Sequence, residues 1–125
     1  KLVLLQPTSP LRSVEDVAGS LAMYRDNLDM VVTVTKSHAP AVLCYDVESG
    51  YVQLVYNKNA SGRQQLQEMY EFNGAVYVIN IHSLLEKGIS GFTKRVKYIM
   101  SKENSVDIDD IYDFYQVETI IRNKF

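Results

Sequence analysis

Two apolar runs flank a well-capped amphipathic segment within the first 35 residues. The runs Lys1–Leu5 and Asp29–Thr35 are rich in leucine, valine and threonine, as buried strands are. Between them, Ser13 precedes apolar residues at helical spacing and has Asp16 three positions later, the pattern of a helix N-cap. A strand, loop, helix and strand in this order predict a right-handed βαβ unit. The expected fold is therefore α/β, with a mainly parallel sheet flanked by helices.

The rest of the chain continues this alternation. A buried strand is predicted after Asn73 and Gly74, followed by a short helix that Gly88 ends. Alternating basic and apolar residues then indicate an edge strand, and a last helix follows an acidic loop. The predicted ranges are 75–79 for the buried strand, 82–87 for the short helix and 95–100 for the edge strand, and Ile111, Phe114, Val117 and Ile121 share one face of the last helix.

Between residues 41 and 56 the pattern changes to two short strand-like runs. The runs 41–45 and 51–56 are joined by the turn-forming residues 47–50, which predicts a β-hairpin standing off the main sheet. We therefore expect a single domain over residues 1–125, with a protruding hairpin arm over about residues 41–60.

Composition and charge exclude several classes of protein. With 46% apolar and 22% charged residues, a chain of 125 residues suits one ordinary globular core. The net charge is −2 and the basic residues are scattered, so neither a nucleic-acid surface nor an anionic-membrane surface is expected. No apolar run approaches the roughly 20 residues that span a bilayer, and no signal-peptide pattern occurs, so a cytoplasmic protein is the default expectation. The single cysteine, Cys44, lacks partners for a disulfide or a zinc site and is expected to be at least partly buried.

The acidic loop carries a pair of carboxylates that suits a metal ion. Asp107 and Asp109 alternate around Ile108, so an extended backbone points both carboxylates to one side. Mg²⁺ prefers one or two carboxylates together with water and phosphate oxygens. The alternative is that these acids cap the last helix at its positive end, a role that Asp110 and Asp113 fit better.

A polar loop follows the first predicted strand. Gln6, Thr8, Ser9 and Arg12 surround two prolines at the carboxyl end of this strand, the edge where open α/β sheets bind ligands. The alternative is a rigid turn whose hydroxyl groups satisfy nearby backbone.

Other polar residues carry weaker signals. Arg63 could clamp a carboxylate or phosphate, although a lone arginine is usually solvated. Asn73 could offer its amide to a sugar hydroxyl, although an Asn-Gly pair is more often a turn. His38 and His82 share no motif with an acid or a nucleophile, so a catalytic triad has no support.

Four motifs, in order along the chain, resemble those of the acylneuraminate cytidylyltransferases, the CMP-sialic acid synthetases. They are QPTSPLR at 6–12, SGRQQL at 61–66, NGAVYV at 73–78 and SVDIDDIYDF at 105–114. Together they extend over nearly the whole chain, which makes the resemblance specific at family level. It implies a Rossmann-like fold and a nucleotidyltransferase that joins CTP to a nine-carbon 2-keto sugar acid, releases pyrophosphate and uses Mg²⁺.

The resemblance also implies roles for particular residues. Asp107 and Asp109 match the family's catalytic, metal-binding aspartates. The positions that match residues around the substrates are Gln6, Thr8, Ser9, Arg12, Arg63, Gln64, Asn73 and Tyr77.

The resemblance has consequences for assembly and activity. It implies a homodimer in which the hairpin arm reaches a neighbouring subunit. The glycine-, arginine- and lysine-containing loop that holds the CTP triphosphate in this family would lie before Lys1, so this chain is expected to be the C-terminal part of the enzyme and to be inactive alone. A family lysine is missing near Val42, which affects the expected sugar specificity.

Two other functions stay open at this point. The first is a sibling cytidylyltransferase for another acidic sugar, such as a pseudaminic, legionaminic or deoxyoctulosonic acid. The second is a non-catalytic dimerisation or binding module that keeps the fold without the nucleotide loop.

Overall fold

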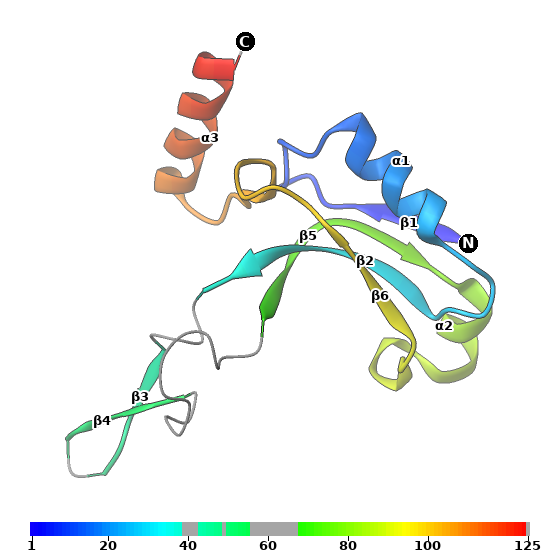
Figure 1. The fold of residues 1–125 in the computed structure, drawn as a ribbon, viewed down its shortest axis with the longest axis horizontal. Coiled ribbons are helices and arrows are strands. Elements are labelled where there is room, and N and C mark those ends of the chain that lie inside the picture. The colour runs from blue at the N-terminus through cyan, green and yellow to red at the C-terminus, as the bar shows by residue number, and fades with distance from the viewer. Residues whose placement is uncertain (39–42, 49, 56–67, 125) are drawn as a thin grey trace. The chain divides into compact units, whose positions relative to one another are not determined.

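The computed structural model describes residues 1–38, 43–48, 50–55 and 68–124. Its chain divides into two compact units, the first formed by residues 1–35 and 72–125 and the second by residues 36–71. The elements, in chain order, are β1 (Leu2–Leu5), α1 (Val14–Met23), β2 (Met30–Ser37), β3 (Cys44–Asp46), β4 (Val52–Leu54), β5 (Met69–Ile79), α2 (Ile81–Lys87), a 3₁₀ turn (Ile89–Gly91), β6 (Arg95–Ile99), a second 3₁₀ turn (Glu103–Ser105) and α3 (Ile111–Lys124) (Figure 1).

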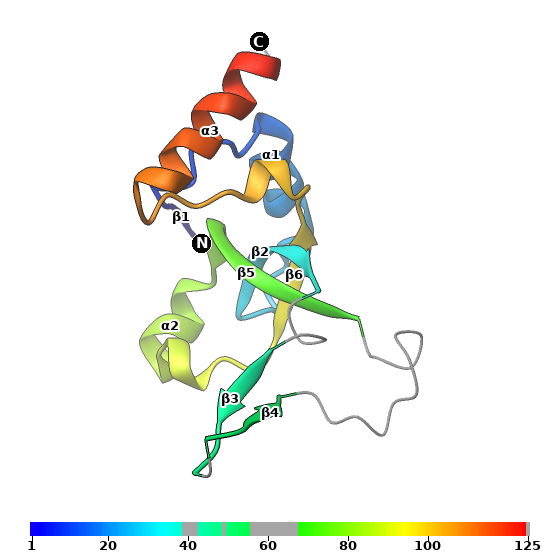
Figure 2. The same ribbon diagram turned by 90° about the vertical axis from the view of Figure 1, so that its left-hand side faces the viewer.

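A four-stranded sheet in the order β1, β5, β2, β6 forms the framework of the first unit. β2 and β6 are parallel, with Met30 opposite Arg95, whereas β1 and β5 are antiparallel. β5 also runs against β2, since Asn80 donates to the carbonyl of Asp29 while Val76 lies beside Thr33. Figure 2 shows β5 lying across the sheet, where β2 is its neighbour on the side away from β1.

The α/β class is confirmed, but the prediction of a mainly parallel sheet is wrong because the sheet is mixed. The chain leaves the sheet at the end of β2 and enters β5 at the same end, so β5 runs back beside β2. A parallel strand at this place would require a crossover to the opposite end of the sheet. β5 thus separates β1 from the parallel pair β2 and β6.

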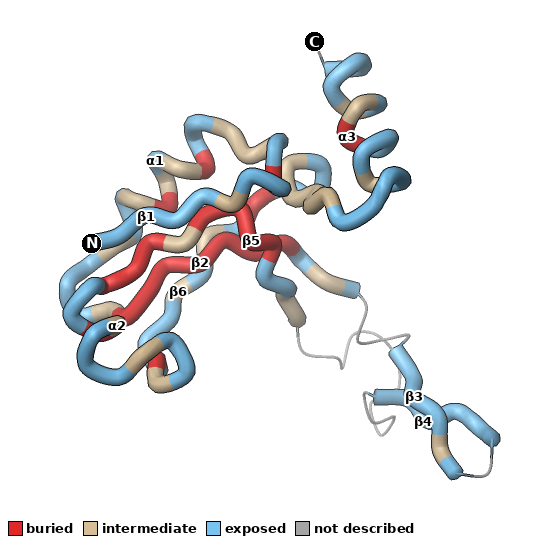
Figure 3. Tube along the Cα trace, turned by 180° about the vertical axis from the view of Figure 1, so that it is seen from behind, coloured by how far each residue is buried: buried red, intermediate tan, exposed pale blue. Residues whose placement is uncertain are grey.

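The core lies where the two central strands meet α1. Figure 3 shows β2 and β5 as the buried strands of the sheet. Residues from α1, including Val17 and Leu21, pack against this core. The predicted capping box at the start of α1 is confirmed, because the Ser13 side chain accepts from the Asp16 amide and the Asp16 carboxylate accepts from the Ser13 amide. The buried apolar cluster consists of Val31, Ala75, Val76, Val78 and Met100.

β1 is a strand as predicted, but the expectation that it is fully buried is wrong. All four of its side chains are 38–47% exposed. The reason is its place at the edge of the sheet, where it pairs only with β5. The half-exposed edge strand predicted over 95–100 corresponds to β6 at the opposite edge.

In the second unit, β3 and β4 pair antiparallel, with Cys44 opposite Leu54 and Asp46 opposite Val52. The predicted strand pairing is thus confirmed, in a shorter form. Cys44 is exposed, so the expectation that it is at least partly buried is wrong; a two-stranded ribbon leaves both of its faces open. A dimerisation role for this hairpin stays a prediction.

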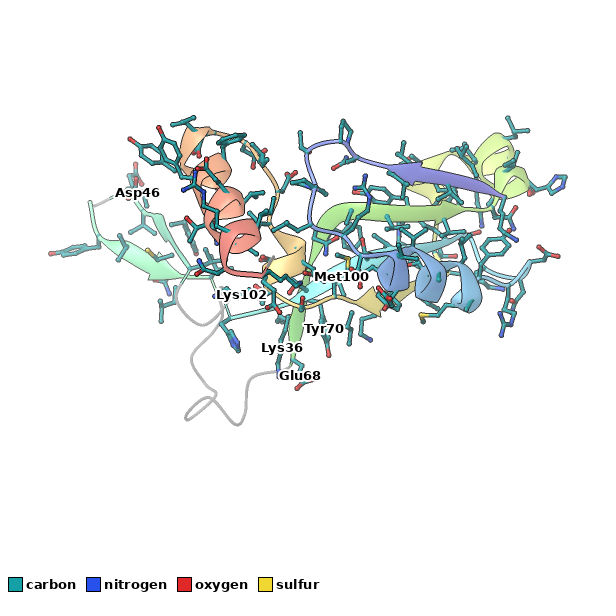
Figure 4. All side chains as sticks on the ribbon, turned by 90° about the horizontal axis from the view of Figure 1, so that it is seen from above. Lys36, Asp46, Glu68, Tyr70, Met100 and Lys102 are labelled. Atoms are coloured by element: carbon teal, nitrogen blue, oxygen red, sulfur yellow. The ribbon has the colours of Figure 1, made fainter. Side chains whose placement is uncertain are left out.

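A small polar cluster lies where β2 ends and β5 begins. Lys36 Nζ is 3.3 Å from Glu68 Oε1, and the Tyr70 hydroxyl donates to Glu68 Oε2 over 3.1 Å (Figure 4). The hydrogen bond to Glu68 is the main cause that raises the pKa of Tyr70 above its ordinary value, and desolvation and the negative charge of Glu68 act in the same direction. Both members of the ion pair are more than half exposed, so it contributes little to stability.

The last predicted helix is present as α3, but its apolar face is only partly covered. Val117 is buried, while Ile111, Phe114 and Ile121 are exposed. Tyr112 and Tyr115 pack edge to face beside this apolar stripe. Within the described residues, no helix is both long and apolar enough to span a membrane.

Candidate functional site

The polar loop after β1 is held in one conformation by Arg12. Nη1 of this arginine donates to the carbonyl of Gln6 over 2.7 Å, to that of Ser9 over 3.0 Å and to that of Ala75 over 3.2 Å. The Ser9 amide also donates to the Gln6 carbonyl, which closes a turn. The guanidinium therefore holds the loop 6–12 against β5. A contact between Arg12 and a ligand stays a prediction.

Gly74 allows Gln6 to lie directly against β5. Gly74 has a φ of +74°, and a Cβ built there would lie 2.3 Å from Gln6 Oε1. Both the backbone conformation and the close approach therefore require glycine. The Asn-Gly pair was interpreted from the sequence as more often a turn, but it lies within β5, and Gly74 makes room there for the Gln6 side chain.

Asn73 lies at the centre of a buried hydrogen-bond network. Its Oδ1 accepts from the Thr33 hydroxyl over 2.7 Å and from the Ala75 amide over 3.1 Å. Its Nδ2 donates to Ser105 Oγ over 2.9 Å and to Met100 Sδ over 3.3 Å. Two acceptor and two donor positions are the full capacity of an asparagine amide, so protein groups use all of them.

The acidic loop is attached to this framework at two points. Ser105 accepts from Asn73 and donates its own proton to the Ser101 carbonyl over 2.6 Å. Three residues later, the Ile108 amide donates to the Thr8 carbonyl over 2.9 Å. Asp107 lies between these two anchors and beside the loop 6–12.

Asp107 and Asp109 form an electrostatically strained pair. The negative charge of Asp107 is the main cause that raises the pKa of Asp109 above its ordinary value near 3.8, and partial burial and the charges of Asp113 and Asp110 act in the same direction. Oδ1 of Asp107 is buried and has no hydrogen-bond partner among the described residues. Buried polar atoms without a hydrogen-bond partner are uncommon in folded proteins.

The other two acids of the loop have a different role. The Asp113 amide donates to Asp110 Oδ1, while Asp113 Oδ2 accepts from the amides of Asp109 and Asp110. These bonds satisfy free amides at the start of α3, as the capping alternative in the sequence analysis requires. Asp110 and Asp113 therefore cap α3, whereas the side chains of Asp107 and Asp109 interact with each other.

This pair fits a divalent cation, and magnesium is the ion that the sequence analysis expects. A cation would occupy the partnerless oxygen of Asp107 and relieve the repulsion that raises the pKa of Asp109. No cluster of three or more His, Cys, Asp or Glu side chains suited to a metal ion occurs in the part of the chain that the structure describes. Such an ion would therefore take its other ligands from water and from a bound phosphate.

The structure brings together most of the predicted site residues. Gln6, Ser9 and Arg12 surround the start of the buried part of β5, and Thr8 contacts the acidic loop. Tyr77 lies further along β5, opposite Leu4 in the register with β1. Arg63 and Gln64 lie outside the described residues.

Sequence reasoning missed Thr33 and Ser105, which complete the network around Asn73. Thr33 interrupts a run of valines in the most buried strand of the sheet. A hydroxyl group in such a place requires a partner, and this requirement was the available signal. For Ser105 the signal was its position at the start of the motif 105–114, two residues before Asp107.

Curated relatives match nearly the whole chain. The N-acylneuraminate cytidylyltransferase of Escherichia coli is 34% identical over 128 aligned residues, which cover 97% of this chain and 30% of the relative. The protein of that name from Streptococcus agalactiae serotype V is 34% identical over 121 residues, which cover 94% of this chain and 29% of the relative. The chain is a homologue of the N-acylneuraminate cytidylyltransferases.

This cytidylyltransferase homologue spans about 30% of the length of those relatives. It is also 27% identical to the post-translational flagellin modification protein B of Campylobacter coli, over 98% of this chain and 53% of that protein. No family model matches the chain. The relatives named N-acylneuraminate cytidylyltransferase agree with the resemblance that the four motifs carry.

Proposed function

We propose that this chain is the metal-side and sugar-side part of a cytidylyltransferase that transfers CMP from CTP to a sialic-acid-like 2-keto sugar acid and releases pyrophosphate. The observation that carries the proposal is the pair Asp107 and Asp109 beside the loop 6–12: one oxygen of Asp107 is buried without a hydrogen-bond partner, and the pKa of Asp109 is raised by the charge of Asp107. Homology to proteins named N-acylneuraminate cytidylyltransferase supports the same reaction class.

Asp107 and Asp109 would hold Mg²⁺ in this enzyme. When bound, the ion would neutralise charge on the phosphate oxygens of the nucleotide. Gln6, held against Gly74, and Thr8, whose carbonyl holds the acidic loop, would line the substrate side of the site. The chain's own contribution is thus a fixed geometry for two carboxylates and a polar loop, as transfer reactions of this type require.

The exposed apolar residues of the β3 and β4 ribbon favour a homodimer in which this ribbon contacts a second subunit. Tyr45, Tyr51 and Val52 are all more than half exposed. Surfaces of this kind mark interaction sites when they are contiguous. We place the enzyme in the cytoplasm, where CTP is available.

The test is formation of CMP-sugar from CTP and N-acetylneuraminic acid with Mg²⁺. Two chains are compared: residues 1–125, and a version extended into the upstream reading frame. Product formed only by the extended chain supports the proposal and the need for a separate nucleotide loop. No product from the extended chain with any acidic sugar would contradict it and favour a non-catalytic binding module.

The identity of the sugar is a separate question. A relative named for flagellin modification is among the similar proteins, and its name specifies no sugar. The assay therefore includes a pseudaminic, a legionaminic and a deoxyoctulosonic acid. Turnover of one of these without turnover of N-acetylneuraminic acid would assign the sibling activity.

A further inference from the structure

Asp107 lies between Ser105 and Ile108, and hydrogen bonds of these two residues hold the acidic loop to two different parts of the fold. The Ile108 anchor is a single backbone bond to the loop 6–12. The Ser105 anchor reaches into the core, because Ser105 contacts Asn73 and Asn73 contacts Thr33 in the middle of β2. The position of the acidic loop is therefore set from two sides.

The directions of the hydrogen bonds around Ser105 allow only one orientation of the Asn73 side-chain amide. Ser105 has one hydroxyl proton, and it points to the Ser101 carbonyl, so Ser105 Oγ is an acceptor toward Asn73. Asn73 Nδ2 must then be the donor, which orients its Oδ1 toward the Thr33 hydroxyl and the Ala75 amide. Reversing the amide would place donor against donor at the Ala75 amide.

The strength of this network comes from burial. Thr33 is fully buried and Asn73 is 8% exposed, so the bond between them is shielded from competition with water, while the bond from Asn73 to Ser105 is part-buried. Thr33 Oγ1 also accepts from the Val76 amide over 2.9 Å, which binds β2 to β5 at the same level of the sheet. The network therefore fixes the position of the acidic loop relative to β2 and β5.

From these contacts we propose that Asn73 is a positioning residue that sets the acidic loop through Ser105, rather than a residue that contacts the sugar. The proposal rests on the proposed function in one respect, namely that Asp107 and Asp109 hold a divalent cation. Partners that orient metal ligands commonly change metal affinity by about 10- to 100-fold when they are removed. Asn73 would act in this way through the backbone from Ser105 to Asp107.

The test compares two serines of the same loop. Ser105→Ala removes the acceptor for Asn73, whereas Ser101→Ala removes a hydroxyl that accepts from the Asn104 amide and leaves the Ser101 carbonyl in place. Ser105→Thr keeps the hydroxyl and serves as the rescue variant. Amide hydrogen exchange at Ile108 is measured in EDTA, and Mn²⁺ affinity is measured by electron paramagnetic resonance of the free ion.

For Ser105→Ala we expect exchange at Ile108 at least about tenfold faster and Mn²⁺ binding at least about tenfold weaker. Ser101→Ala and Ser105→Thr should remain within about twofold of the unaltered chain in both measurements. Equal exchange at Ile108 in Ser105→Ala and Ser101→Ala would overturn the positioning role, whatever happens to Mn²⁺. Absence of Mn²⁺ binding to the unaltered chain, with the exchange difference intact, would overturn the cation site of the proposed function and leave Asn73 as the anchor of the loop.

Discussion

Two aspartates of this chain show how surroundings decide the role of a residue. Asp29 is buried and accepts from the amides of Thr93 and Lys94 and from the Ser83 hydroxyl, and its Oδ1 lies 3.0 Å from Lys87 Nζ. The two backbone bonds are the main cause that lowers its pKa far below the ordinary value. Asp109 has the opposite shift because its neighbours are acids. The first carboxylate is stabilised in its charged form, and the second is destabilised in that form.

Replacing Asp29 with Asn should therefore weaken the fold in a pH-dependent way. The folded pKa lies below the unfolded one, so its stabilising contribution is present at neutral pH and is lost as the pH falls below about 4. We expect Asp29→Asn to lower the melting temperature by about 5–10 °C at pH 7, with the difference shrinking in acid. Asp46→Asn, at an exposed position, is the control and should have little effect. An equal loss at pH 7 and pH 3 would contradict this role.

At the scale of elements, most of the candidate site residues lie on two loops, and contacts with the strands hold these loops in place. The loop 6–12 is fixed by Arg12 and by the fit of Gln6 against Gly74, and the acidic loop is fixed by Ser105 and Ile108. The strands supply the points of attachment. A change in β5 should therefore reach the site through Gln6.

The glycine in β5 allows this coupling to be measured. Gly74→Ala introduces both a positive-φ cost and a clash with Gln6, whereas Gly88→Ala has the same type of φ cost with no atom within 4 Å of the added Cβ. We expect Gly74→Ala to lower the melting temperature more than Gly88→Ala does, because Gln6 must move. The double variant Gly74→Ala with Gln6→Ala should recover the excess loss. Equal losses in the two glycine variants would show that the contact with Gln6 has no energetic weight.

The sequence predicted individual elements better than their connections. The capping box of Ser13 and Asp16, and the acids that cap α3, depend on neighbours in the chain, so local pattern revealed them. The antiparallel direction of β5 and the exposure of β1 depend on which strands become neighbours in the sheet. Continuous apolar runs favour buried parallel strands but do not fix which strands become neighbours, which is why these two features were predicted wrongly. The Thr33 partner of Asn73 is 40 positions away and was missed for the same reason.

For the whole molecule, the exposed edge strand is the main weakness. β1 has unpaired backbone on one side and carries Leu2, Val3, Leu4 and Leu5 in exposed positions. Such edges pair with other chains. We expect residues 1–125 to self-associate with concentration in sedimentation velocity, and Val3→Lys to reduce this association. A monomer at all concentrations with a single high, reversible melting transition would contradict the expectation.

The proposed cation site would hold Asp107 and Asp109 close together at a cost to the stability of the metal-free fold. Because the folded pKa of Asp109 is raised, the folded state binds its proton more tightly than the unfolded state does, and this contribution is lost as the pH rises through the raised pKa. At neutral pH the charged pair therefore destabilises the fold, and Asp109→Asn should relieve the repulsion. Asp110→Asn is the matched control, since it removes one charge from the same loop and keeps a capping oxygen.

The most direct test is the melting temperature of the unaltered chain and these two variants at pH 7, in EDTA and in about 10 mM Mg²⁺. We predict that Asp109→Asn melts above the unaltered chain in EDTA and shows no response to Mg²⁺, while the unaltered chain and Asp110→Asn are both stabilised by the ion. A loss of stability in Asp109→Asn without metal, together with an unchanged response to Mg²⁺, would show that the pair is a structural feature and not a cation site.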